Sequence, residues 1–379
     1  CWGPKWRVSC APTHPGKEAT RRGEGEDAES QSEVFDAVVV CNGHYSEPRV
    51  PTFPGSEQWP GTQMHSHNYR EPAPAFVGKN VVVLGAMASG EDLSREIATV
   101  AAKVHLAARG YTPPKELGDM GCASSDPGNR TRRGGIVELL PHCSGVRFED
   151  GSVEEDVDII MYATGYHYTF PFLHTRGVGG GNEEDGAGGA NHRGNGSGAS
   201  AMLAVSTDDN CVSPLYQHVF PPQLAPSLSF IGLPWKVVPF PQFELQAKWI
   251  AQVLSGAAAD VAADVTARDK TIRDGGDDVE GPAADLIGWG GLPSRSDMAA
   301  DAAAFEAGLE SNSVPRRHAH QMGDAQFAYN DMLSARCGTP PLADWRADMY
   351  HATGIRKRAQ PQGYRDGPLP WGDESLRGA

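Results

Sequence analysis

The residues from Gly78 to Ala108 constrain the fold more than any other part of the chain. The apolar run Gly78–Leu84 predicts a buried strand, and the small-residue turn Gly85–Gly90 (GAMASG) follows it. From Gly90 to Ala102, apolar residues recur at three- and four-residue spacing and predict a helix, and Val104–Ala108 predicts the next strand. Strand, helix and strand form a βαβ unit, which is typical of a parallel sheet. We therefore expect an α/β fold.

The turn inside this unit has the spacing of a dinucleotide-binding G-x-G-x-x-G motif with one substitution. Gly85 and Gly90 occupy the outer positions, while Met87 stands where the second glycine lets the backbone approach a pyrophosphate. The motif still follows a strand and opens a helix, whose first N–H groups attract phosphate. A purely structural βαβ turn is the alternative. The predicted nucleotide-binding residues are Gly85, Ala86, Met87, Ala88, Ser89 and Gly90.

Arg109 follows the second strand of the unit, at the position that selects between the two nicotinamide cofactors. A guanidinium there can pair with a 2′-phosphate, whereas an acidic residue would accept hydrogen bonds from the ribose hydroxyls. We expect no acidic residue at the end of this strand to bind the ribose hydroxyls. Arg109 therefore predicts a preference for NADP over NAD.

Two more apolar runs end in small-residue turns. Phe35–Cys41 predicts a buried strand ending at Asn42 and Gly43, and the run 157–163 predicts a strand ending at Thr164 and Gly165. Each turn alone indicates only the end of a strand. Together with the turn at 85–90 they fit a two-nucleotide flavoprotein, in which a second domain interrupts the cofactor domain.

The C-terminal half is predicted to alternate between ordered and low-complexity segments. Leu228–Leu233 predicts a strand, and a helix is expected from about Phe243 to Leu254. The turn that contains Gln242 lies where the N-terminus of this helix could face a flavin carbonyl. A helical tail is expected over 297–350. We expect irregular structure at 110–135 and low-complexity insertions at 176–210 and 257–291.

Composition limits the partners and the compartment. The net charge of −15 argues against a nucleic-acid partner, and no apolar run approaches the roughly 20 residues of a transmembrane helix. The 7 cysteines are dispersed without a C-x-x-C pair, which indicates reduced thiols and a cytoplasmic setting. The scattered histidines offer no metal-ligand spacing, so no metal site is expected.

The segment Trp59–Tyr69 (WPGTQMHSHNY) resembles the F-x-G-x-x-x-H-x-x-x-Y/F signature of flavin-containing monooxygenases, with Trp59 in place of Phe. Residues 35–55, 81–97 and 162–166 (YATGY) strengthen the resemblance. The stretch 213–249 is similar to the plant and algal branch, which includes glucosinolate S-oxygenases, and the tail at 314–350 fits as well. Apart from the insertions, the resemblance covers most of residues 1–350.

The resemblance implies two Rossmann-like domains, with the NADPH domain (72–164) inserted into an FAD domain (1–71 and 165–350) and a tail at 351–379. It implies that NADPH reduces FAD and that O₂ adds to the reduced flavin. The resulting hydroperoxide passes one oxygen atom to a soft nitrogen or sulfur nucleophile of a small molecule. Since the flavin carries this chemistry, no catalytic dyad is expected. His65 and Tyr69 would lie beside the cofactors, as chemical participants or as structural hydrogen-bonding and packing residues.

Two departures from the family pattern define the alternatives. The first G-x-G-x-x-G, which binds FAD near the N-terminus, is absent and the chain starts at Cys1, so we expect an N-terminally truncated protein that binds FAD poorly. Met87 stands in place of glycine. Both departures also fit a decayed, non-catalytic homologue that retains a nucleotide-binding fold. A pyridine-nucleotide disulfide reductase shares the architecture but needs a cysteine pair, which this chain lacks.

Overall fold

The computed structural model describes residues 5–10, 31–111, 128–173, 175–176, 205–257, 291–360 and 363–364. It divides into two compact units. Unit 1 comprises residues 1–44 and 168–344, and unit 2 comprises residues 45–167 and 345–379. Most of the two predicted low-complexity insertions lies outside the described residues. No described helix is long and apolar enough to cross a membrane.

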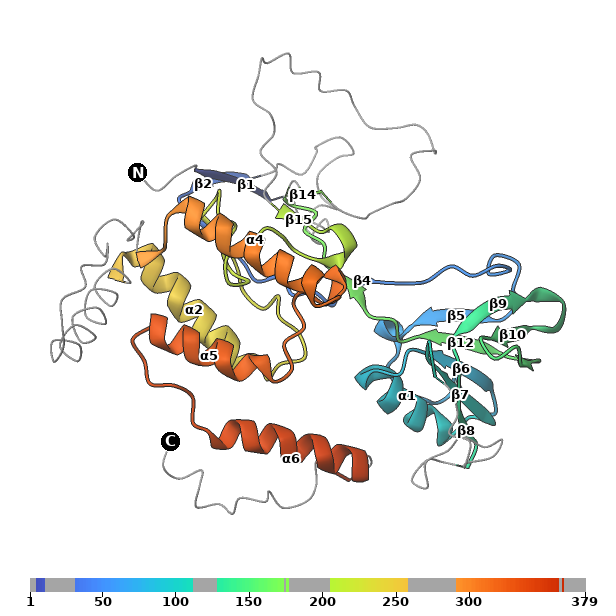
Figure 1. The fold of residues 1–379 in the computed structure, drawn as a ribbon. Helices are drawn as coiled ribbons and strands as arrows, with labels where there is room; N and C mark the ends of the chain where they lie inside the picture. Colours follow the sequence, from blue (N-terminus) through green and yellow to red (C-terminus); the bar gives the residue numbers. More distant parts are fainter. Residues whose placement is uncertain are drawn as a thin grey trace, which may run out of the picture. The chain divides into compact units, whose positions relative to one another are not determined.

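Unit 2 is built on a five-stranded parallel sheet, which confirms the predicted α/β class (Figure 1). The strand order is β5–β12–β6–β7–β8, and the predicted helix after β6 is present as α1 (Ala88–Ala98). The strands are β5 (Thr62–His65), β6 (Asn80–Leu84), β7 (Lys103–Ala107), β8 (Arg130–Arg133) and β12 (Ile159–Tyr162).

Strand β8 corrects the expectation of irregular structure over the whole of 110–135. Its sequence RTRR carries no apolar signal, so periodicity could not find it. The strand exists because its backbone pairs in parallel with β7, from Val104 opposite Arg130 to Ala107 opposite Arg133. The residues at 112–127 lie outside the described part of the chain.

The two faces of the five-stranded sheet are covered by different elements. Val81 and Val83 of β6 pack with Ile97 of α1, whereas Val82 and Leu84 pack with a second, three-stranded antiparallel sheet. Figure 1 shows α1 and this smaller sheet around β6 and β12. Alternating side chains of a strand point to opposite faces, so a sheet covered on both sides gives a continuous apolar run. The smaller sheet consists of β9 (Ile136–Leu140), β10 (Gly145–Phe148) and β11 (Val153–Glu154).

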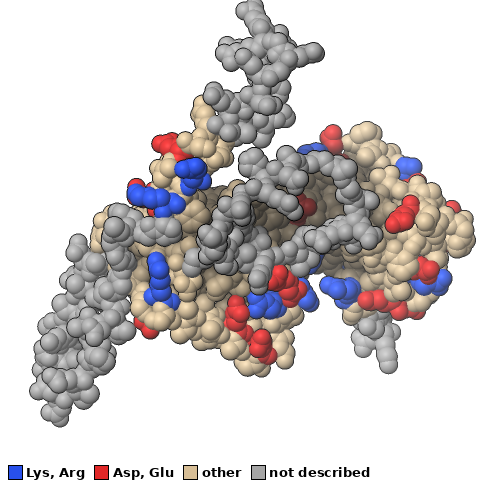
Figure 2. All heavy atoms as spheres, turned by 90° about the horizontal axis from the view of Figure 1, so that it is seen from above, with Lys and Arg blue, Asp and Glu red and all other residues tan. Residues whose placement is uncertain are grey.

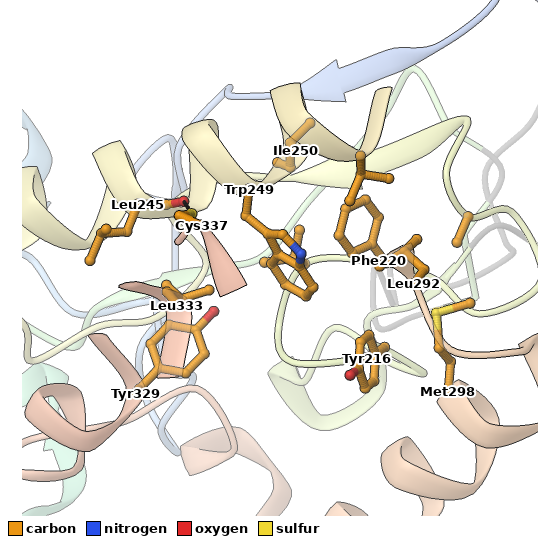
Figure 3. Close-up of a cluster of buried hydrophobic side chains, with 13 residues drawn as sticks. Tyr216, Phe220, Leu245, Trp249, Ile250, Leu292, Met298, Tyr329, Leu333 and Cys337 are labelled. Carbon is orange, nitrogen blue, oxygen red and sulfur yellow. Dashed lines mark hydrogen bonds between the residues drawn. The ribbon is translucent and has the colours of Figure 1, made fainter. Parts of the chain in front are cut away.

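Unit 1 has a helical core centred on Trp249 of α2 (Pro239–Ser255). In Figure 3, side chains from α2 and α5 (Ala325–Arg336) and from the segment before β16 lie around the Trp249 indole, which is 1% exposed. The Arg336 guanidinium lies 4.9 Å from the centroid of the Trp249 ring and 5.2 Å from that of Tyr216. Met298 of α4 (Arg295–Ser311) packs into the same cluster. The predicted helix at 243–254 is thus confirmed, although it begins four residues earlier.

The strands of unit 1 are short. β3 (Val38–Val40) pairs in parallel with β16 (Leu228–Phe230), and β1 (Trp6–Cys10) pairs antiparallel with β2 (Gln31–Phe35). The prediction of one buried strand over Phe35–Cys41 is therefore wrong. Phe35 is 39% exposed and pairs with Trp6 in a different sheet, so the chain changes sheets at Asp36 and Ala37.

The remaining elements are short connections and the last helix. Unit 2 also contains α6 (Trp345–Ala359), whose Lys357 Nζ lies 3.2 Å from the Asp92 carboxylate of α1. The expected helical tail is therefore made of α4, α5 and α6. The short strands are β4 (Glu47–Pro48), β13 (Tyr166–His167), β14 (Thr175–Arg176) and β15 (Val205–Ser206), and the 3₁₀ turns are η2 (Ser66–Asn68), η4 (Pro141–Cys143), η5 (Asp208–Asn210) and η7 (Arg316–His318).

Candidate functional site

Two glycines bring the turn between β6 and α1 into close contact with its surroundings. Gly85 has a φ of +111°, and a Cβ placed on it would lie 2.3 Å from the carbonyl oxygen of Ala163. A Cβ on Gly90 would lie 1.6 Å from the carbonyl oxygen of Gly85. Neither position can hold a side chain without moving the backbone. The outer glycines of the predicted motif therefore have the role the motif requires, which is to fold the turn tightly onto strand and helix.

The N-terminus of α1 is open to an incoming anion. Met87 is the N-cap residue with extended backbone, and its side chain makes no capping hydrogen bond. The side chain is 53% exposed, and Ala88 and Ser89 are exposed beside it. The first N–H groups of a helix lack partners within the helix and carry its positive dipole end. The geometry therefore offers backbone donors to a phosphate.

An acidic residue in the first turn of α1 is neutralised by three arginines. Three arginine Nη2 atoms form ion pairs with the Glu91 carboxylate oxygens. Their N···O distances are 2.8 Å for Arg130, 2.6 Å for Arg132 and 3.1 Å for Arg95. Arg130 is fully buried in this cluster. The excess of positive charge compensates for the carboxylate, which would otherwise oppose an anion at the helix N-terminus.

The turn lies where the order of the parallel strands reverses. From β6 the chain adds β7 and β8 on one side, and it later adds β12 on the other. Open α/β sheets bind ligands in the crevice at the carboxyl ends of strands at such a point. Thr164 and Gly165 follow β12 at this edge, where Arg49 donates to the Thr164 carbonyl from Nη2 at 2.7 Å and from Nε at 3.1 Å.

His65 is held by backbone groups on both sides of its ring. Its Nδ1 accepts the His67 N–H at 3.0 Å, so Nε2 carries the hydrogen and donates to the Gly165 carbonyl oxygen at 3.0 Å. Burial lowers the pKa of the imidazole, which favours the neutral form. These contacts support the structural alternative for His65, since Nδ1 caps the 3₁₀ turn that follows β5 and Nε2 fixes the turn after β12.

Tyr69 packs its ring against Phe76, with a centroid distance of 5.7 Å. Burial, followed by the nearby carboxylate of Glu96, raises the pKa of the Tyr69 hydroxyl above its usual value. The phenol therefore stays protonated at neutral pH. Its surroundings support packing over proton transfer.

Arg109 is exposed directly after β7, as the sequence predicts, but an acidic residue also lies at this strand end. The Glu149 carboxylate accepts hydrogen bonds from the Gly110 and Gly135 N–H groups, each at 2.9 Å. The expectation that no acid stands there is therefore wrong. Glu149 comes from the turn after β10, and its position depends on the smaller sheet, which was not predicted.

Asn42, Gly43 and Gln242 belong to unit 1, whereas the other predicted site residues belong to unit 2. Asn42 is exposed after β3 and donates to the Thr169 carbonyl at 3.4 Å, and Gly43 has a φ of +73° with open space around its Cα. Gln242 lies in the first turn of α2, rather than before the helix, and is fully buried. Its Nε2 lies 3.3 Å from the Met322 sulfur, while its Oε1 has no hydrogen-bond partner among the described residues.

A contact between a half-buried and a buried histidine of unit 1 was not predicted. The Nδ1 atoms of His218 and His320 are 3.0 Å apart, and His320 Nε2 accepts the Val212 N–H at 3.0 Å. Burial lowers the pKa of His218 to about 4 and that of His320 well below its ordinary value. Scattered single histidines give no sequence signal for such a pair. Among the described residues, no three His, Cys, Asp or Glu side chains are placed to hold a metal ion.

Comparison with known proteins places these features in a family. Residues 20–112 and 131–179 match the flavin-binding monooxygenase-like family model. The flavin-containing monooxygenase FMO GS-OX-like 3 of Arabidopsis thaliana is 39% identical over 98% of this chain and 65% of its own length. The chain belongs to the flavin-containing monooxygenase family. Another member, FMO GS-OX5 of the same plant, is 36% identical over 98% of this chain and 63% of its own length.

Solved structures agree with this assignment. The S-allyl-L-cysteine S-oxygenase of Allium sativum superposes with a TM-score of 0.70 and 38% identity, over 99% of this chain and 66% of the other. Tmm from Pelagibacter sp. shares the fold, with a TM-score of 0.60 and 20% identity over 90% of this chain and 62% of the other. The chain thus spans about 65% of the length of the curated relative FMO GS-OX-like 3.

FAD and NADPH are the standard cofactors of flavin-containing monooxygenases, and the two units fit them differently. In unit 2 the crowded glycines and the uncapped helix provide a phosphate cradle. In unit 1 the buried Gln242 Oε1 has no partner within the described part of the chain and is suited to a donor from a cofactor, but no G-x-G-x-x-G motif precedes β3 in this sequence. The turn after β6 therefore fits the phosphates of NADPH, and the residues of unit 1 fit FAD in part.

Proposed function

We propose that this chain is the larger part of an NADPH- and FAD-dependent monooxygenase, which transfers one oxygen atom of O₂ to a soft nitrogen or sulfur atom of a small molecule. The observation that carries the proposal is the phosphate cradle of unit 2, formed by β6, the turn Gly85–Gly90 and α1. Family membership supplies the reaction class. The name of one similar protein, the S-allyl-L-cysteine S-oxygenase of Allium sativum, favours a thioether sulfur as the substrate group.

In this proposal the side chains bind and orient rather than react. The N–H groups of α1 hold the pyrophosphate of NADPH, and Arg109 pairs with its 2′-phosphate. His65 and Arg49 fix the turn at Thr164 and Gly165, at the edge of the sheet where the nucleotide lies. Asn42, Gly43 and Gln242 would contact FAD. When bound, FAD supplies the activation of O₂ with electrons from NADPH.

A second candidate is a non-catalytic homologue that keeps the nucleotide-binding fold. Met87 in place of glycine favours it, because the thioether stands beside the phosphate cradle. The two candidates agree on nucleotide binding and differ in flavin chemistry.

Binding and turnover separate the two candidates. NADP⁺ binding to the 379-residue chain is measured by calorimetry, and the chain is then saturated with FAD and mixed anaerobically with NADPH. Bleaching of the flavin absorbance, followed by conversion of methyl phenyl sulfide to its sulfoxide in air, is the expected result. NADP⁺ binding without bleaching of bound FAD would support the non-catalytic homologue. Absence of NADP⁺ binding would contradict both.

A further inference from the structure

The carboxylate of Glu149 occupies the strand end that recognises the ribose of a nicotinamide cofactor. Its Oε2 accepts the Gly110 N–H at 2.9 Å, and Gly110 is the residue after Arg109. The same oxygen accepts the Gly135 N–H at 2.9 Å, and the Glu149 N–H donates to the Gly135 carbonyl oxygen at 2.9 Å. Backbone bonds on both sides therefore fix the carboxylate at the end of β7.

The side chains of Glu149 and Arg109 both lie beside Gly135. A Cβ placed on Gly135 would lie 2.8 Å from Glu149 Oε1 and 3.0 Å from Arg109 Cγ. The glycine at 135 leaves room for both side chains here. Donation from the two N–H groups, with a smaller contribution from the positive charge of Arg109, keeps the pKa of Glu149 below its usual value. The carboxylate is therefore ionised at neutral pH.

The two side chains act in opposite directions on a bound ribose. A guanidinium attracts the 2′-phosphate of NADPH, whereas a carboxylate repels it and accepts a hydrogen bond from the free 2′-hydroxyl of NADH. The N–H groups of Gly110 and Gly135 engage only Oε2, so Oε1 keeps its accepting capacity.

We propose that Glu149 is a specificity-determining residue that limits the preference of unit 2 for NADPH over NADH. The proposal rests on the proposed function, because it needs the nucleotide in the cradle of unit 2. In this proposal the negative charge of Glu149 opposes the attraction of Arg109 for the 2′-phosphate. The wild-type chain is then expected to bind NADH as well as NADPH, with a modest preference for NADPH.

The test uses two small probes of the ribose site, adenosine 2′,5′-bisphosphate and adenosine 5′-monophosphate. Their dissociation constants are measured by calorimetry for the wild-type chain and for Glu149→Gln, which keeps an oxygen acceptor for Gly110 and Gly135 but removes the charge. The ratio of the two constants is expected to shift by about fivefold in favour of the bisphosphate, the size expected for one nearby, solvent-screened charge. Glu149→Ala removes both the charge and the hydrogen-bond acceptor for Gly110 and Gly135, so the shift of the ratio in favour of the bisphosphate should be smaller.

Glu138→Gln is the matched control. It makes the same chemical change on β9, where Glu138 pairs with Arg147 at 3.1 Å, and it should leave the ratio within about twofold. An unchanged ratio in Glu149→Gln, or an equal shift in Glu138→Gln, would overturn the proposal while leaving nucleotide binding intact. Failure of the wild-type chain to bind either probe would instead contradict the proposed nucleotide site of unit 2.

Discussion

The turns after β6 and after β3 have similar sequences and different surroundings. Both follow a valine-rich run and contain glycine. After β6, Gly85 and Gly90 are so crowded that an added Cβ would meet backbone oxygens, and α1 begins at once. After β3, Gly43 has open space around it, the sheet has two strands and the chain continues as irregular structure.

The difference shows what turns a strand end into a phosphate site. A glycine with positive φ makes a turn, but the donors come from a helix packed closely against the strand. Unit 2 contains both parts within the chain. Unit 1 contains the strand and the turn, but the next element after β3 among the described residues is the short strand β4 and not a helix. On the face drawn in Figure 2, Lys and Arg side chains are interspersed with Asp and Glu.

The largest expected effect is that of Gly90→Ala. The added Cβ would meet the Gly85 carbonyl oxygen, so the turn must open, and we expect NADP⁺ binding to fall by more than about 100-fold. The matched change Gly43→Ala meets no atom within 4 Å and costs only the left-handed backbone, about 1 kcal/mol of unfolding free energy. Calorimetry with NADP⁺ and urea unfolding compare the two variants. Equal losses of nucleotide affinity would contradict the distinction between the turns.

The substitution Arg109→Ala tests whether the end of β7 binds the 2′-phosphate of NADPH. Loss of a hydrogen bond to a charged group should weaken NADPH binding by about 1.5–3 kcal/mol and NADH binding much less. Arg147→Ala on β10, whose guanidinium pairs with Glu138, is the control and should affect neither. Fluorescence titration with both cofactors measures the difference. Equal weakening of NADPH and NADH would place the 2′-phosphate elsewhere.

Acid should destabilise unit 1 through the histidine pair His218 and His320. The folded-state pKa of His218 is about 4, whereas an unfolded histidine titrates near 6.5. Between these two pKa values the unfolded state binds more protons than the folded state. The contribution of neutral His218 to the free energy of unfolding is therefore fully present above about pH 6.5 and is lost as the pH falls towards 4. Between pH 7 and pH 5 the loss from His218 should be about 2 kcal/mol.

Urea unfolding, followed by the fluorescence of the buried Trp249, measures this loss. His218→Gln should show a shallower pH dependence than the wild-type chain, and the exposed His142→Gln should follow the wild type. An unchanged slope in His218→Gln would contradict the account of the pair.

The sequence predicted what is local and missed what is assembled from distant segments. The unit from β6 to β7 was predicted because its apolar spacing, glycines and helix lie within about thirty consecutive residues. The strand β8 was missed because RTRR has no periodic signal, and Phe35–Cys41 was misjudged because its two halves pair in different sheets. Glu149 was missed because it meets Gly110 across 39 positions of the chain. The cradle was thus predictable, and the acid beside it was not.

The smallest expected effect is that of Met87→Gly. A methionine hinders close approach of the backbone to a pyrophosphate, but this side chain is 53% exposed and flexible, so it can turn away. We expect NADPH to bind about threefold more tightly and reduction of added FAD to be faster, measured by anaerobic stopped flow. No change in affinity or rate would mean that the methionine is fully tolerated and would remove the main support for the non-catalytic homologue.

Hydrogen–deuterium exchange with and without NADP⁺ tests the difference between the two turns most directly. Amide exchange reports local opening, so a bound pyrophosphate should protect the N–H groups it contacts. We predict slower exchange in peptides covering Gly85–Gly90 and the β7 end at Arg109, and unchanged exchange at 38–44. Protection at 38–44 without protection at Gly85–Gly90 would show that unit 2 does not hold the nucleotide, and would contradict the account.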